Sequence, residues 1–281
     1  MRVHLDCFPC FLRQSIIALR LGTKDESLRE TILKSTLDYI QNTDISKPPA
    51  YTTTFIHKKI RQMLGIDPFK EIKSEYNQIA LRLYPSLKTT IEKSPDPLWI
   101  STRLAIAGNV IDFGIFTSVD IEGAIRKALN NQLAVDDYSS FKNAISIADK
   151  ILYLTDNAGE IVFDRLLIET LIHLGKEVKA VVKGSPVIND STMEDAEESG
   201  IIGVCDVIDN GSEAVGTILE WTSSVFQKIF NDAQLVISKG QGNFETLIGA
   251  EKKIFFLFLS KCDVVSKELG LSTGSMLLKK S

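Results

Sequence analysis

After residue 98 the chain alternates short apolar runs with segments of amphipathic helical pattern, and this alternation limits its fold more than any other feature. The apolar runs cover residues 151–155, 178–182, 205–208, 234–238 and 254–259. Continuous runs of this kind are typical of strands buried on both faces, and the segments between them are long enough for crossover helices. The pattern therefore predicts an α/β fold with a mostly parallel sheet covered by helices.

The first part of the chain carries helical patterns instead. Apolar residues recur at spacings of three and four over residues 8–22, 28–40, 53–64 and 69–84. Prolines interrupt the pattern near residues 48 and 95, where a helix ladder loses a backbone donor. We expect two units: an all-helical N-terminal region over residues 1–98 and an α/β domain over residues 99–281.

Composition and charge exclude several classes of protein. Of 281 residues, 44% are hydrophobic and 24% are charged, which is close to the globular average, and the formal charge is −4. A general nucleic-acid binder carries a basic excess, and a membrane-spanning helix needs about 20 apolar residues. The first residues also carry an acid where a signal peptide has its apolar stretch. We expect a cytoplasmic protein with neither nucleic acid nor membrane as a partner, whose oligomeric state the sequence leaves open.

Polar and small residues gather directly after the predicted strands. In an open parallel sheet, ligands bind outside the carboxyl ends of the strands, so these positions are the candidate site. The segments in question are Asp156-Asn157-Ala158-Gly159-Glu160, Asn189-Asp190, Lys239-Gly240-Gln241-Gly242-Asn243 and Lys261-Cys262, with Gly108-Asn109 and Asp112 before them.

The side chains at these positions suit a metal and a phosphate group. Asp156, Asn157 and Asp190 offer the oxygen ligands that hard divalent cations prefer. Glycines in the 239–243 loop let backbone amides approach a phosphate, and Lys261 adds positive charge. A metal beside a phosphate pocket indicates phosphoryl transfer or hydrolysis.

Each motif taken alone also fits a purely structural role. Residues 157–160 and 191–194 both match the capping-box pattern at the start of a helix. The 239–243 segment equally suits a tight turn between a strand and a helix. It is the combination of acids, amides, glycines and lysines at several strand ends that favours a functional site.

The same motifs resemble those of the DUF89 family of metal-dependent damage-control phosphatases. The resemblance is strongest to the branch with an N-terminal Cys-x-x-Cys, here Cys7 to Cys10, and a C-terminal Lys-Cys, here Lys261-Cys262. The matching motifs run through nearly the whole chain in the expected order. The resemblance implies a helical N-terminal region on a Rossmann-like sheet, and a phosphatase that acts on small phosphorylated metabolites.

The resemblance also implies roles for individual residues. A divalent metal (Mg²⁺, Mn²⁺, Co²⁺ or Ni²⁺) would be held by Asp156, Asn157 and Asp190. Glu160, the 239–243 loop and Lys261 would face the phosphorylated substrate, although in some branches the acid stands one residue later than Glu160. Among the branches, substrates include sugar phosphates, phosphopantetheine-type compounds and nucleotide-like phosphates, and the resemblance does not choose between them. Clearing damaged metabolites is the role that this family implies.

Our mechanistic hypothesis assigns the remaining polar groups. A carboxylate that does not bind the metal, Asp112 or Glu160, would orient the attacking water. The predicted catalytic residues are therefore Asp156, Glu160 and Asp112. A covalent route through Asp156 is the second hypothesis. The predicted substrate-binding residues are Asn109, Lys239, Gly240, Gly242, Asn243 and Lys261.

Three questions stay open at the level of sequence. Cys7 and Cys10 fit structural thiols, a redox pair or half of a metal site, and Cys205 and Cys262 join them only if the fold brings them together. A non-catalytic metal or nucleotide sensor is the alternative to a phosphatase. A carboxyl methyltransferase is less favoured, because the first turn has one glycine where a cofactor loop is glycine-rich.

Overall fold

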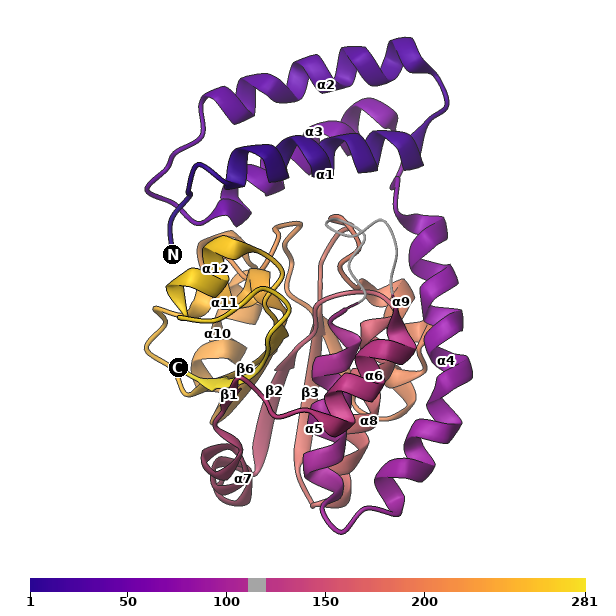
Figure 1. The fold of residues 1–281 in the computed structure, drawn as a ribbon, viewed down its shortest axis with the longest axis vertical. Coiled ribbons are helices and arrows are strands. Elements are labelled where there is room, and N and C mark those ends of the chain that lie inside the picture. Colours follow the sequence, from indigo (N-terminus) through magenta and orange to yellow (C-terminus); the bar gives the residue numbers. More distant parts are fainter. Residues whose placement is uncertain (111–119) are drawn as a thin grey trace.

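The computed structural model describes residues 1–110 and 120–281. Within these residues lies one mixed sheet with helices on both faces and a helical layer across one end (Figure 1). No helix of the described part is long and apolar enough to cross a membrane.

The sheet has seven strands within the described part of the chain. They are β1 (Val135–Asp136), β2 (Lys150–Leu154), β3 (Glu177–Val182), β4 (Asp206–Asp209), β5 (Leu235–Lys239), β6 (Ile254–Leu259) and β7 (Met276–Lys280). Their order is β1-β7-β6-β5-β2-β3-β4. All five strands expected from the apolar runs are present and pair in parallel with one another, which confirms the predicted α/β class.

The topology places a switch point at the middle of the sheet. From β2 the chain proceeds outward through β3 to β4, then returns to add β5 on the other side of β2. Loops that leave β2 and β5 therefore diverge in opposite directions and open a crevice at their carboxyl ends. The edge strand β1 and its neighbour β7 were not predicted from the sequence, and β7 runs antiparallel to β6.

Helices cover both faces of this sheet. Alternation along β2 directs Ile151 and Tyr153 toward the helices of one face, and Leu152 and Leu154 toward the other. The first face carries α5 (Pro97–Gly108), α7 (Tyr138–Ile147) and α8 (Glu160–His173), with α6 (Ile121–Asn130) packed on α5. The second carries α10 (Ser224–Asp232), α11 (Gln241–Leu247) and α12 (Asp263–Glu268). The connections also hold α9 (Met193–Glu198) and the 3₁₀ turns η1 (Ile201–Gly203) and η2 (Leu219–Trp221).

The N-terminal helices form a layer over one end of the sheet and a buttress along its side. In Figure 1, α1 (Cys7–Gly22), α2 (Glu26–Gln41) and α3 (Pro49–Leu64) lie together across the top, and we call these three helices the cap. The longer α4 (Lys70–Glu92) runs down the side and packs against α5, α8 and α9. The division of the chain near residue 98 stays a prediction.

Prolines act differently in α3 and α4. Pro49 opens α3, where its missing backbone donor would be unpaired in any helix. In contrast, α4 continues through Pro85 to Glu92, beyond the expected end near residue 84. Leu87 and Ile91, which follow Pro85, are both buried. Burial of these apolar side chains stabilises the additional turns of α4.

The contact between α5 and α8 depends on a residue without a side chain. A Cβ atom at Gly108 would lie 2.9 Å from Cβ of the buried Phe163. We expect Gly108→Val to lower the free energy of unfolding by about 2 kcal/mol, because the extra atoms overfill a packed interface. Gly249→Val is the control, since nothing lies within 4 Å of its Cβ position. Denaturant unfolding measures both, and equal losses would contradict this account of the α5–α8 contact.

Candidate active site

A cavity of about 550 Å³ lies between the cap and the carboxyl ends of the central strands. Its floor includes residues that follow β2, β3, β5 and β6, and its roof comes from α1 and α3. Five predicted site residues line it: Asp156, Asn157, Asp190, Gly242 and Lys261. The cavity therefore occupies the switch point, where the topology opens a crevice.

The three predicted metal ligands are brought together. Asn157 and Asp190 pair through an antiparallel backbone bridge, and Asp156 directly precedes Asn157. A further backbone hydrogen bond of 2.8 Å, from the Ala158 amide to the Asn189 carbonyl, joins the same two loops. All three ligand side chains are buried yet line the cavity. Loops from neighbouring strands thus present two carboxylates and one amide to a shared space.

Hydrogen bonds fix the Asp156 carboxylate. Its Oδ2 accepts from Nδ2 of Asn109 at 3.0 Å and from Nδ2 of Asn157 at 2.8 Å. Its backbone carbonyl accepts from the Ser191 amide at 2.7 Å. Two amide donors on one oxygen hold the carboxylate in one orientation.

Gly240 allows the loop after β5 to approach this carboxylate. Its φ is +82°, and a Cβ atom there would lie 2.0 Å from Oδ2 of Asp156. Any other residue would therefore displace the carboxylate as well as strain the backbone. Gly240 itself does not line the cavity. Its role in binding substrate stays a prediction.

The loop that carries Asp190 contains a strained residue. Ile188 has a φ of +47°, the one positive φ outside glycine among the described residues. A β-branched side chain is disfavoured in this region, at a cost of about 1–3 kcal/mol. Such strain persists where the surroundings impose it, typically at functional sites. Ile188 lines the cavity two residues before Asp190.

Beneath the cavity a buried lysine ties two acids together. Lys239 Nζ donates to Oε1 of Glu160 at 2.7 Å, to the carboxylate of Asp164, and to the Ala105 carbonyl at 2.8 Å. Lys239, Glu160 and Asp164 all have zero exposed surface. Oε2 of Glu160 accepts from the side-chain amides of Asn109 and Asn157, both at 2.8 Å. Glu160 thus links the lysine to the residues that surround Asp156.

Burial and charge act against each other in this cluster. Burial raises the pKa of the Asp164 carboxyl, although the Lys239 ammonium opposes the change. Burial would lower the pKa of Lys239, but the Asp164 and Glu160 carboxylates outweigh it, so the pKa of Lys239 is raised. The lysine therefore stays protonated and serves as a fixed internal cation.

The other predicted residues divide into two groups. Gly242 and Lys261 line the cavity, within reach of a ligand. Lys239, Glu160 and Asn243 lie behind it, and Nδ2 of Asn243 donates to the carbonyls of Thr155 and Lys239 at 3.2 and 2.7 Å. Asp112 lies outside the described residues. The catalytic and substrate-binding assignments of all these residues stay predictions.

The capping boxes that the sequence suggested at residues 157–160 and 191–194 are both wrong. The residue before α8 is Gly159, which has no side-chain cap, and Nδ2 of Asn157 instead donates to the Asp156 and Glu160 side chains. The capping box of α9 joins Thr192 and Asp195, one residue later than the pattern suggested. The Asn157 side chain therefore contacts residues of the candidate site and does not cap the helix.

Asn77 on α4 is a supporting residue that the sequence analysis missed. Its Oδ1 accepts from the Gly159 amide at 2.5 Å, and its Nδ2 donates to Oδ1 of Asp195 at 3.1 Å and to Oε2 of Glu198 at 2.8 Å. Asn77 has no exposed surface. It therefore anchors the turn between Asn157 and Glu160 from a separate helix. No local pattern signals a contact that spans 82 residues.

Three of the four thiols gather on the cavity wall. Cys7, Cys10 and Cys262 line it, whereas Cys205 does not. Burial raises the pKa of Cys7 and of Cys262, which keeps both as neutral thiols near pH 7. No group of three or more His, Cys, Asp or Glu side chains in residues 1–110 and 120–281 is arranged to hold a metal ion. The neutral thiols of Cys7, on the cap helix α1, and of Cys262 add apolar surface to the cavity wall.

Glu245 on α11 also faces this wall and was not singled out from the sequence. It lines the cavity, and its Oε1 accepts from Nε2 of Gln241 at 2.8 Å. Burial raises the pKa of Glu245 to about 7, which the Gln241 hydrogen bond only partly opposes. Near neutral pH this carboxyl is therefore poised between its neutral and charged forms.

The donor set at the cavity floor fits a hard divalent cation. Asp156 and Asp190 supply carboxylates and Asn157 an amide oxygen, a set that Mg²⁺ accepts when waters and substrate complete its octahedron. Asn157 uses its Nδ2 toward Asp156 and Glu160, so its oxygen points elsewhere. Because its third donor is an asparagine, this set is not one of the clusters of three or more His, Cys, Asp or Glu side chains considered above.

Comparison with known proteins extends over the whole chain. The sequence pattern of the damage-control phosphatase ARMT1-like domain matches residues 3–277. A protein of Methanocaldococcus jannaschii is 36% identical over 100% of this chain and 96% of its own length. A damage-control phosphatase of Archaeoglobus fulgidus is 32% identical over 99% of both chains.

A solved structure agrees with the sequence matches. The crystal structure of a DUF89 family protein from Pyrococcus horikoshii has a TM-score of 0.90 and 33% identity, covering 100% of this chain and 99% of that chain. The predicted family resemblance is thereby confirmed, together with the fold that it implied.

Removing the Asn77 side chain should loosen the turn that it anchors. We expect Asn77→Ala to speed hydrogen exchange of the Gly159 amide by about tenfold and to destabilise the protein by about 1–3 kcal/mol, because a buried donor loses its acceptor. Gln78→Ala is the matched control, since Gln78 also donates to Glu198, at 2.7 Å, but does not contact the turn. Amide exchange followed by NMR distinguishes them. Similar exchange at Gly159 in both variants would refute the anchoring role.

Glu245 should make stability fall as pH rises. Its pKa is about 7 in the folded chain against an ordinary 4.5, so between these values the folded protein binds more protons than the unfolded one. The free energy of unfolding should therefore decrease from pH 4.5 to 7, by on the order of 3 kcal/mol for this group. Glu245→Gln should remove that decrease, whereas the exposed Glu251→Gln should not. Denaturant unfolding across this pH range is the measurement, and unchanged slopes in Glu245→Gln would overturn the assignment.

Proposed function

Since this chain belongs to the damage-control phosphatase family and is a phosphatase, we propose that it requires a divalent metal and hydrolyses a small phosphorylated metabolite. The observation that carries the proposal is the meeting of Asp156, Asn157 and Asp190 with Lys261 in one cavity at the switch point. Hard oxygen ligands beside a cation are the chemistry that binding a phosphate monoester requires.

Asp156, Asn157 and Asp190 would hold the metal. When bound, it would act as a Lewis acid toward a phosphate oxygen and lower the pKa of a coordinated water. The chain contributes the orientation of these ligands: Asn109 and Asn157 hold Oδ2 of Asp156, and the backbone bridge to Asp190 fixes the second loop. Preorganised donors of this kind need little rearrangement during the reaction.

Lys261 and Gly242 would receive the phosphate. Both line the cavity, and the Lys261 amide is held by Oε1 of Gln241 at 2.8 Å. The ammonium of Lys261 would neutralise charge on the equatorial oxygens of the phosphate in the transition state. The glycine leaves its backbone open to the ligand.

Glu160 and Lys239 would act as positioning residues. Both oxygens of Glu160 already accept hydrogen bonds, one from Lys239 and the other from the two asparagines around Asp156. This arrangement favours a role in fixing Asn109 and Asn157 over direct contact with water. Orienting the water is then the role we propose for Asp112, with Glu160 as the alternative.

The cavity favours a metabolite of limited size. Its volume of about 550 Å³ suits a sugar phosphate or a nucleotide-like phosphate, since ligand pockets span roughly 300–1,000 Å³. The cap closes it from above, which would limit access by long polymers. We place the activity in the cytoplasm, in the removal of damaged phosphorylated metabolites.

The decisive experiment is phosphate release from an aryl phosphate after treatment with a chelator. We expect activity to vanish with chelation and to return when Mg²⁺, Mn²⁺, Co²⁺ or Ni²⁺ is added singly. Asp156→Asn should lower turnover by at least about a hundredfold, because even supporting residues of metal sites contribute 10–100-fold. Asp209→Asn is the matched control: Asp209 also ends a strand of the sheet but lies outside the cavity, exposed to solvent.

The outcomes separate a phosphatase from a sensor. Restored turnover that depends on Asp156 supports the proposal. A folded protein that releases no phosphate with any metal, from the aryl ester or from a panel of metabolites, would overturn it. Thermal stabilisation by metal and nucleotide without turnover would then favour the sensor.

A further inference from the structure

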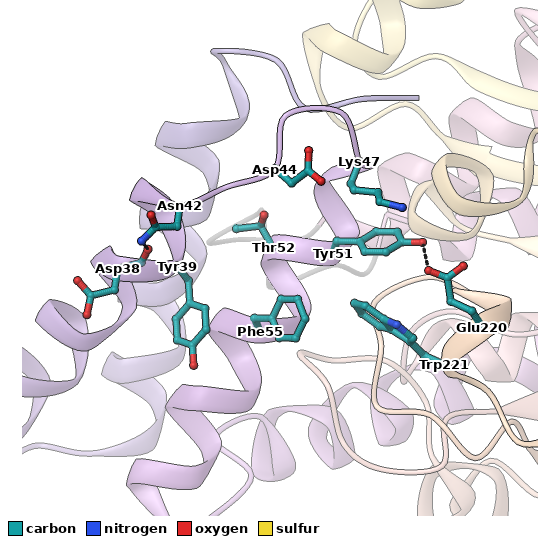
Figure 2. Close-up of a pocket in the computed structure, with 10 residues that line it drawn as sticks. All are labelled: Asp38, Tyr39, Asn42, Asp44, Lys47, Tyr51, Thr52, Phe55, Glu220 and Trp221. Atoms are coloured by element: carbon teal, nitrogen blue, oxygen red, sulfur yellow. Dashed lines mark hydrogen bonds between the residues drawn. The ribbon is translucent and has the colours of Figure 1, made fainter.

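A second cavity lies on the opposite side of α3 from the candidate active site. It has a volume of about 640 Å³ and is formed by the end of α2, the loop that follows it, α3 and the η2 turn (Figure 2). Pro49, Ala50 and Thr53 of α3 line the active-site cavity, whereas Tyr51 and Phe55 line this one. The two spaces therefore share a helix as a wall but have different linings.

Four aromatic rings from three separate elements line the second cavity. Tyr39 comes from α2, Tyr51 and Phe55 from α3, and Trp221 from η2 (Figure 2). The Trp221 ring meets Tyr51 edge to face at 4.7 Å between centroids and Phe55 at 5.3 Å. Tyr39 and Phe55 are nearly parallel, with centroids 6.2 Å apart. The rings thus form one connected aromatic surface.

This surface is left open to solvent. The exposed fraction is 39% for Tyr39 and 44% for Phe55, although both are large aromatic residues. Tyr51 and Trp221 are partly buried beside them. Aromatic side chains that pack in a core are shielded from water, so two exposed rings in one connected group of four are unusual for a surface that has only a structural role. Rings of this kind bind ligands through their faces.

Carboxylates outnumber cations around the rings. Asp38, Asp44 and Glu220 line the same cavity, against one ammonium, that of Lys47. Lys47 Nζ lies 5.3 Å from the Tyr51 centroid, so one ring already carries a cation of the chain itself. Glu220 accepts a 2.8 Å hydrogen bond from the Tyr51 hydroxyl, which fixes one carboxylate at the edge of the aromatic surface. The excess of negative charge favours a positively charged ligand.

We propose that this second cavity binds a small organic cation that carries apolar groups, such as a quaternary ammonium compound. Aromatic faces attract such cations through their quadrupoles, and the alkyl groups bury apolar surface against the same rings. The carboxylates supply charge complementarity at the rim. This site is separate from the phosphatase centre and does not depend on the function proposed above.

The probe is choline, and its neutral counterpart 3,3-dimethylbutan-1-ol has a carbon atom in place of the nitrogen. Each molecule carries nine equivalent methyl protons, so saturation-transfer NMR detects both with equal ease on the intact protein. We expect saturable binding of choline, and at least about tenfold weaker binding of the neutral alcohol, because only the cation gains electrostatic attraction from the ring faces and the carboxylates in addition to apolar contact. Equal affinity for both compounds, or no saturable binding of choline, would overturn the proposal.

Variants assign the binding to this cavity. Phe55→Leu removes an exposed ring and Glu220→Gln removes one negative charge, and each should weaken choline binding several-fold. Glu92→Gln, at the exposed end of α4, is the charge control and should leave binding unchanged. Circular dichroism checks that each variant is folded. Choline binding that survives both cavity variants in folded protein would place the cation elsewhere and refute the site.

Discussion

The buried contact of Lys239 with Glu160 and Asp164 is the interaction on which the rest of the site depends. Moving an ammonium out of water costs several kcal/mol, and two carboxylates and one carbonyl offset that cost only because their geometry is fixed. The lysine ends β5, and the two acids lie in the first two turns of α8, so the contact joins a central strand to the helix that packs on it. Through Glu160 it also sets Asn109 and Asn157, which hold Asp156. Loss of the lysine would leave two acids buried without a counter-charge, directly beneath the predicted metal ligands.

Much of this arrangement follows from the order of the strands. Continuous apolar runs identify β2 to β6, and parallel strands bring their carboxyl ends to one edge. Residues that are far apart in sequence, such as Asp156 and Asp190, could therefore be expected to meet before any coordinates were known. The family resemblance pointed to the same residues. The strand pattern could not predict which of these side chains line the cavity and which are buried behind the cavity lining.

Lys239 illustrates that limit, and also a signal that was present. It follows Leu235 and Ile237 at steps of two along β5, and both pack on the face that carries α5 and α8. Alternation therefore assigns Lys239 to the interior of that face and not to the cavity. Asn77 offers no such signal, because its contact with Gly159 arises only from the packing of α4 on α8. Strand β7 was not predicted for a third reason: its lysine-rich end lacks the continuous apolar run that is typical of a strand buried on both faces.

The cap shows how one helix serves two different surfaces. With 3.6 residues per turn, positions 50 and 53 of α3 share the face that lines the candidate active site, and positions 51 and 55 share the face that carries the aromatic rings. Thr54 lies between them, and its Oγ1 accepts from the Val215 amide at 3.0 Å. Val215 lines the active-site cavity, and the same chain segment continues to Glu220 and Trp221. A ligand that shifted α3 against this segment would therefore alter both cavities at once, since the contacts that position the helix are shared between them.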